Sequence, residues 1–147
     1  MLKIKTKKFN ELSISELYEI LQLRSEVFVV EQDCVYQDLD GKDKCALHVF
    51  GTKNNKIVAY TRVFKPGDYF KEASIGRVVV ALKERHHKYG NIIMEASIKV
   101  IQGFNKKMVI KISAQSHLKL FYNNLGFIEE GEEYLEDEIP HIIMLLK

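Results

Sequence analysis

The segment at residues 78–98, VVVALKERHHKYGNIIMEASI, restricts the possible folds of this chain more than any other. It opens with three β-branched valines, which favour a strand. A short turn rich in lysine, arginine and histidine follows, and from about residue 90 to 104 apolar side chains recur at helical spacing. A further strand-like run, MVIKISA at 108–114, comes next. The order strand, tight turn, helix, strand predicts a β-α-β unit.

The segments on either side carry shorter-range signals. SISE places Ser13 and Glu16 as a capping box at the start of a helix that we expect to reach about residue 29. Two strand-like runs flank Asn54–Asn55 and predict a hairpin. We also expect a strand at 2–8, a turn at Pro66, a strand at 74–80, a short helix at 116–126 and a closing hairpin in EEYLEDEIPHIIMLLK.

This element order predicts an α/β fold with a mostly antiparallel sheet, helices on both faces and one β-α-β crossover. The chain has 147 residues, of which 46% are hydrophobic and 29% charged, as in a globular protein. It has no repeat, no low-complexity tract and no linker-like segment. We therefore expect a single domain over residues 1–147.

Charge and hydropathy exclude several classes of function. A net charge of +2 does not favour nucleic-acid binding. The apolar runs are strand-sized, and the first residues do not resemble a secretory signal, so we expect neither membrane insertion nor export. The two cysteines, Cys34 and Cys45, form no metal-binding pattern, and we expect free thiols in a cytoplasmic protein. The histidines also lack a metal-ligand spacing, so no metal site is expected.

The basic turn before the second helix has the properties of an anion site. The first backbone N–H groups of a helix have no partner within the helix and point along its positive dipole end, where phosphate binds well. Arg85 and Lys88 add charge, and Gly90 lets a ligand approach the backbone. The alternative is a solvated charged turn on an ordinary β-α-β unit.

Two segments resemble motifs of the GNAT superfamily, the acetyl-CoA-dependent N-acetyltransferases. RHHKYG is similar to the family's R/Q-x-x-G-x-G/A phosphate turn, with Arg85 first, Gly90 last and Lys88 where the middle glycine is usual. About thirty residues later, QSHLKLFYNNLGF is similar to N-x-x-A-x-x-[FL]-Y-x-x-x-G-F. There Tyr122 matches, whereas Gln115 replaces the usual asparagine.

The likeness extends over nearly the whole chain to the ElaA-like branch of that superfamily, through the segments LQLRSEVFVVEQDCVYQDLDG, IGRVVV, AQSHLKLFY and IPHIIM. It implies acetyl-CoA as cosubstrate and an N-acetyltransferase reaction by direct transfer in a ternary complex. The residues that it places at the coenzyme are Val78, Val79, Val80, Arg85, His86, His87, Lys88, Tyr89, Gly90, Asn91 and Gln115. It also implies that a backbone N–H near Val79 holds the developing oxyanion.

The catalytic roles follow from the same likeness and from side-chain chemistry. Tyr122 is the expected general acid for the coenzyme A thiolate, with a phenol packed elsewhere as the alternative. The base that deprotonates the amine could be Glu31, His48, His141 or a water chain, and the sequence does not choose among them.

The loop after the first helix holds five acids between residues 31 and 43. Asp38 and Asp40 are the expected contacts of a cationic amine substrate, with His48 and His141 beside it. The alternative is a solvated loop, or neutralisation by Arg62 and Arg77.

Other functions on the same fold stay open at this point. One is a non-catalytic acyl-CoA-binding or regulatory module. Another is suggested by LRSEVFVVEQ, which is faintly similar to the acyl-homoserine-lactone synthases. The amine substrate, the acyl chain length and the oligomeric state, including a homodimer, are also open.

Overall fold

The computed structural model describes residues 1–147 and contains two β-sheets. The first has the strand order β1-β2-β3-β4, with bounds β1 Lys3–Lys8, β2 Leu47–Lys53, β3 Lys56–Phe64 and β4 Ser74–Val80. The second has the order β5-β7-β6, with bounds β5 Ile110–Gln115, β6 Ile128–Glu136 and β7 Ile139–Leu146. All pairings within the two sheets are antiparallel.

Both expected hairpins are present, and their turns explain why. Asn54 and Asn55 have φ angles of 51° and 63° between β2 and β3. Asp137 and Glu138 have φ angles of 50° and 65° between β6 and β7. Two successive residues with positive φ match the right-handed twist of paired strands, and asparagine and aspartate tolerate that conformation.

Three α-helices connect the strands, with bounds α1 Ile14–Arg24, α2 Tyr89–Gln102 and α3 Lys119–Asn124. The Ser13–Glu16 capping box opens α1 as predicted. The expected single helix to about residue 29 is interrupted, because Ser25–Glu31 is π-helical, and the next amides keep the wider spacing with bonds from Gln32 N–H to Val27 O and from Cys34 N–H to Val29 O. Four short 3-10 turns complete the set, at Phe9–Glu11, Asp43–Cys45, Leu82–His87 and Ser116–Leu118.

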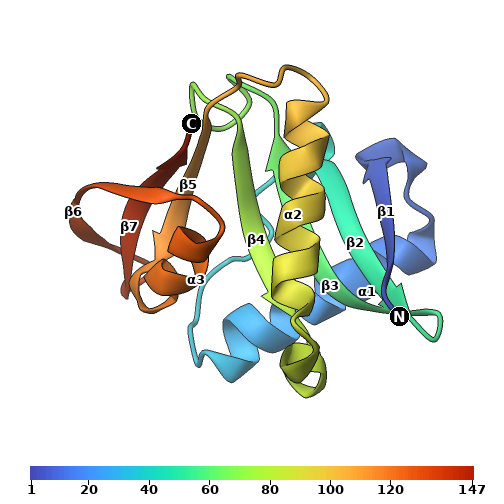
Figure 1. Ribbon diagram of the computed structural model, residues 1–147. Helices are drawn as coiled ribbons and strands as arrows, with labels where there is room; N and C mark the ends of the chain where they lie inside the picture. Colours follow the sequence, from blue (N-terminus) through green and yellow to red (C-terminus); the bar gives the residue numbers. More distant parts are fainter.

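Helices cover both faces of the four-stranded sheet, as expected (Figure 1). Neighbouring strand residues point to opposite faces. Val49 accordingly packs in one core cluster with Ile93 and Met94 of α2, and Phe50 packs in the other with Ile20 and Leu23 of α1. No helix in the chain is long and apolar enough to span a lipid bilayer.

The β-α-β crossover is formed by β4, α2 and β5, but its two strands stay together only where they begin. A single parallel bridge joins Ala73 to Ile110, and the Lys111 N–H donates to the Ala73 carbonyl at 2.8 Å. Beyond it the strands separate, so the one expected sheet is split in two (Figure 1). The split leaves the outer edge of β4 facing a cleft between the sheets.

Candidate active site

The cleft between the two sheets has a volume of about 550 Å³. Its walls come from β4 and β5, from the π-helical segment, from the starts of α2 and α3, and from the turn between β6 and β7. Segments that are far apart in the sequence therefore meet at one place, and the start of the crossover helix α2 is among them.

A β-bulge in β4 shapes one wall. Tyr60 pairs with Val79 and Arg62 with Gly76, so β4 carries one more residue than β3 over this interval. Arg77, inside the bulge, has φ = 48°, in the left-handed region. Bulges bend a strand and take main-chain groups out of the ladder. This one lies directly before the valines 78–80, which line the cleft.

The start of α2 forms the second wall. Lys88 takes the left-handed conformation, with φ 59° and ψ 28°, and no side chain caps the helix. The first amide bonded to the Lys88 carbonyl is that of Ile92, at 3.3 Å. The preceding amides, of Tyr89, Gly90 and Asn91, are the unpaired donors of a helix N-terminus, as an anion site requires.

Gly90 leaves space in this wall that the protein does not use. A Cβ built at this position would lie 3.4 Å from the nearest Phe121 ring atom, an ordinary van der Waals contact. The fold itself would therefore accept alanine, which favours helices more than glycine does. A glycine at this position leaves the backbone open to close approach by a ligand.

Arg85 is already paired with an anion. Its guanidinium donates two hydrogen bonds to the Glu31 carboxylate, at 2.6 and 2.7 Å, and its Nε donates to the Val80 carbonyl at 3.1 Å. A bidentate arginine–carboxylate pair has the geometry of an arginine–phosphate pair. Arg85 thus stands at the cleft in a form that suits a diphosphate, with Glu31 as its partner in the free protein.

Tyr122 projects from α3 into the cleft and is only 6% exposed. Burial raises the pKa of its phenol well above the ordinary value, so the hydroxyl keeps its proton at neutral pH. Phe121 and Phe127 pack edge-on against the ring. They fix the direction of a hydroxyl that has no hydrogen-bond partner within the protein.

These groups fit an acyl-CoA. The free amides of α2, with Lys88 and Arg85, suit the diphosphate, and the bare edge of β4 suits the amide groups of an extended pantetheine arm. Comparison with known proteins agrees: residues 9–147 match the model of the acetyltransferase (GNAT) domain. The chain belongs to the GNAT acetyltransferase family. Members of this fold family bind acyl-CoA and act on amines.

Two relatives show how far the GNAT likeness extends. Protein ElaA of Escherichia coli is 44% identical over 137 residues, which are 92% of this chain and 90% of ElaA. The crystal structure of Escherichia coli ElaA matches with a TM-score of 0.93 over 100% of both chains. An acyl-CoA N-acyltransferase from Pseudomonas aeruginosa matches with a TM-score of 0.91 and 37% identity, over 99% of both chains.

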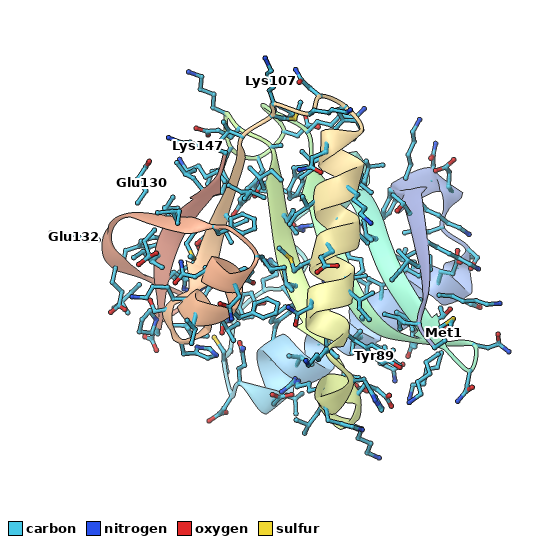
Figure 2. The ribbon with its side chains drawn as sticks, viewed as in Figure 1. Met1, Tyr89, Lys107, Glu130, Glu132 and Lys147 are labelled. Atoms are coloured by element: carbon cyan, nitrogen blue, oxygen red, sulfur yellow. The ribbon has the colours of Figure 1, made fainter.

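Within this GNAT cleft, eight of the eleven residues expected at the coenzyme line the wall: Val78, Val79, Val80, Arg85, Lys88, Gly90, Asn91 and Gln115. The side chains of the other three do not. Tyr89 is buried in the core (Figure 2), and the rings of His86 and His87 lie against each other, tilted by 44°, at the exposed turn. Sequence spacing cannot show this, because the direction of each side chain depends on the backbone conformation of the turn.

The acidic loop does not present Asp38 and Asp40 to the cleft, contrary to expectation. Arg24 Nε lies 2.9 Å from Asp38, and both nitrogens at the end of the Arg62 guanidinium bond Asp40 at 2.8 Å. Arg77 adds a contact of 2.8 Å to Asp38. Neither aspartate lines the cleft. Three arginines thus neutralise Asp38 and Asp40, and neither aspartate is placed to contact a substrate in the cleft.

His48 is also removed from the cleft. It is fully buried, with Nδ1 2.6 Å from the Tyr60 hydroxyl and Nε2 2.9 Å from the Asp43 carbonyl oxygen. Burial lowers the pKa of its imidazole. The alternating strand places it inside, as part of the hydrogen-bonded structure under the loop. His141, in contrast, lines the cleft.

The sequence interpretation missed the acids that do line the cleft. Glu136 and Asp137 reach it from the end of β6 and the following turn, and the cleft wall near them contains Ser113, Tyr36 and Tyr69. The signal was present in LEDEIPH, where acids flank a hairpin turn. This pattern alone could not predict a site, because only the folded arrangement of the strands brings this turn to the open side of β5.

Proposed function

We propose that this GNAT protein is an acetyl-CoA-dependent N-acetyltransferase that moves the acetyl group directly to a primary amine while both substrates are bound. The observation that carries the proposal is the Tyr122 hydroxyl, which keeps its proton, has no hydrogen-bond partner within the protein and lies in the cleft that also contains the free edge of β4. A module that only bound the coenzyme would have no use for such a donor.

The reaction needs two things from this chain. The first is a donor for the oxygen of the thioester carbonyl, and a main-chain N–H next to the β4 bulge, near Val79, would supply it. The second is a proton for the leaving thiolate, and Tyr122 would supply it. The thiolate is a fairly good leaving group, so the phenol should contribute about 100-fold or less.

The amine substrate should be cationic, although for a reason other than the acidic loop. Glu136 and Asp137 are carboxylates at the cleft that form no ion pair with a lysine or arginine. Diamines and lysine-like amines should therefore be better substrates than small neutral amines.

The two cysteines are free thiols, which supports a cytoplasmic location.

A thermal-shift titration tests the coenzyme first. Acetyl-CoA, coenzyme A, ATP and NAD are compared at equal concentration, and a ligand at a hundred times its Kd stabilises by about 2.7 kcal/mol. Acetyl-CoA and coenzyme A should raise Tm by several degrees, and NAD should not. Release of free thiol with a panel of amines then tests the transfer.

The second step separates the enzyme from the binding module. Stabilisation by acetyl-CoA without thiol release from any amine would support the non-catalytic module. Equal rates with 1,4-diaminobutane and with neutral amines would contradict the cationic substrate but leave the transferase in place.

A further inference from the structure

We infer that His141 is the general base that deprotonates the amine, and that Glu136 positions it and stabilises its protonated form. The inference rests on the proposed N-acetyltransferase function. His141 lies on β7, is 6% exposed and lines the cleft. It pairs in register with Gln115, the last residue of β5, after which the chain turns into α3 with Tyr122. The expected base and acid thus approach the cleft from one sheet and the helix that follows it.

The hydrogen bonds of His141 determine which ring nitrogen is free. Nδ1 lies 2.7 Å from the Ile139 carbonyl oxygen. A carbonyl oxygen can only accept, so Nδ1 carries the proton in the neutral ring. The lone pair is therefore on Nε2, and Nε2 is the atom that can take up a proton.

Nε2 faces the Glu136 carboxylate, with 3.5 Å between Nε2 and Oε2. When the imidazole is neutral, both atoms are hydrogen-bond acceptors, so they suit a donor that reaches both. A protonated primary amine has three N–H donors and meets this need. After proton uptake, the imidazolium and the carboxylate form an ion pair at the same place.

A chain of side chains holds Glu136 in position. The Ser113 hydroxyl lies 3.2 Å from Glu136 Oε1, and it also bonds the Tyr134 hydroxyl. A carboxylate only accepts, so Ser113 donates to Glu136 and Tyr134 donates to Ser113. The Tyr134 ring in turn stacks on His141, with 6.2 Å between the ring centroids.

Few other titratable groups face this imidazole. On β6 and its turn they are Glu136, Tyr134 and Asp137, and the neighbouring β5 positions, Ser113 and Gln115, carry no charge. A pH profile of the reaction should therefore report mainly on His141 and its carboxylate partner.

The two other side chains that the sequence offered as base are engaged. Both oxygens of Glu31 accept hydrogen bonds from Arg85, at 2.6 and 2.7 Å. Both ring nitrogens of His48 have buried partners, and this histidine does not line the cleft. His141 Nε2, in contrast, accepts no hydrogen bond within the protein and lies at the cleft.

The proton balance of the step is complete. The amine enters as R–NH₃⁺ and gives one proton to Nε2 of His141. The freed lone pair forms the C–N bond with the thioester carbonyl carbon, the C–S bond breaks, and the thiolate takes the Tyr122 proton. The nitrogen loses its second proton, which restores the phenol. The first proton is released to solvent when His141 returns to its neutral form.

The test compares wild-type protein with His141→Gln, using acetyl-CoA and 1,4-diaminobutane from pH 5.5 to 9. We expect kcat/KM at neutral pH to fall about 100-fold, as is typical for loss of a general base. The acidic limb of the profile should disappear, added imidazole should restore part of the rate, and the Kd for acetyl-CoA should not change. A structural role alone would not produce imidazole rescue.

Glu136→Gln keeps the inference falsifiable if His141→Gln does not fold. Loss of the negative charge should lower kcat/KM, since the imidazolium that forms during proton transfer loses its counter-charge. Glu132→Gln is the matched control, because Glu132 lies on the same strand and points outward into solvent (Figure 2).

The outcomes separate the role of His141 and Glu136 from the transferase function itself. Wild-type kcat/KM and an unchanged acidic limb in folded His141→Gln, or wild-type kcat/KM in Glu136→Gln, would overturn the role of this pair and leave the transferase standing. A wild-type protein that acetylates no amine would overturn the proposed function and the inference together.

Discussion

The Tyr122 hydroxyl has no hydrogen-bond partner within the protein, although the ring that carries it is buried. Most buried hydroxyl groups in proteins are paired. Here Tyr60 bonds His48, and Tyr134 bonds Ser113. The Tyr122 hydroxyl is accessible from the cleft, so a group of a bound ligand can accept its hydrogen bond.

Tyr122→Phe removes only that hydroxyl. We expect kcat for acetyl transfer to fall about 10- to 100-fold, because the thiolate then leaves without its proton donor. The Kd for acetyl-CoA and the Tm should stay close to the wild-type values. Tyr18→Phe, at an exposed position on α1, is the control for loss of a phenol. An unchanged kcat in Tyr122→Phe would exclude the role as acid.

At this scale, a short motif can single out a residue from the sequence. The motif around Tyr122 did so, and the structure places this residue at the cleft. The pair of Arg85 with Glu31 joins positions 54 residues apart, and no local pattern indicates it. The neutralisation of Asp38 and Asp40 also depends on arginines from three separate elements.

The helix α2 shows how a single position can be shaped by binding rather than by folding. Lys88 replaces the usual glycine and takes a left-handed conformation, which costs a residue with a Cβ about 1 kcal/mol or more. In return, a charged side chain lies at the rim of the cleft, beside the free amides.

Lys88→Gly should separate these two effects. It relieves the backbone strain of the left-handed conformation, which stabilises the fold, whereas the greater chain entropy of glycine in the unfolded state destabilises it. The net result should be a rise in the unfolding free energy of about 0.5–1 kcal/mol. Acetyl-CoA should bind more weakly, and with a smaller dependence on salt, because one cation is lost. Lys88→Ala is the matched control, since it loses the charge but keeps the Cβ. Equal stability of the two variants would contradict the strain.

Elements with local signals could be predicted closely. The Ser13 capping box and the paired turn residues act within a few positions, and the structure has them where the sequence places them. The π-helical segment Ser25–Glu31 and the separation of β4 from β5 could not be predicted. Both depend on how distant elements pack, which one strand or helix does not encode.

At the scale of the whole molecule, ion pairs between three arginines and three aspartates join α1, the acidic loop, β3 and β4. Burial acts to raise the pKa of Asp40 and Asp43, but hydrogen bonds and attraction from arginines outweigh it, so both pKa values lie below the ordinary range. Fold stability is thereby coupled to pH.

The lowered pKa values determine whether stability rises or falls with pH. A carboxyl whose pKa is lower in the folded state stabilises the fold above its unfolded pKa, about 4, and this contribution is lost as the pH falls through the folded value. The unfolding free energy from urea titrations should be nearly constant from pH 7 to about 5 and should fall below about pH 4.

Asp40→Asn should lower stability at pH 7 and make the acid slope shallower. Asp68→Asn, at a carboxylate that pairs with no cation, should leave the slope unchanged. An acid slope that is the same in Asp40→Asn and in wild-type protein would show that the network does not control it.

The separation of β4 from β5 also bears on how the protein behaves when ligand is scarce. An unpaired strand edge can add a strand from any chain that reaches it, which is a common route to aggregation. A ligand lying along β4 would cover that edge. Protein without ligand would then aggregate sooner than protein with ligand bound. The concentration of ligand in the cell would affect how much of the protein stays soluble as well as how fast it reacts.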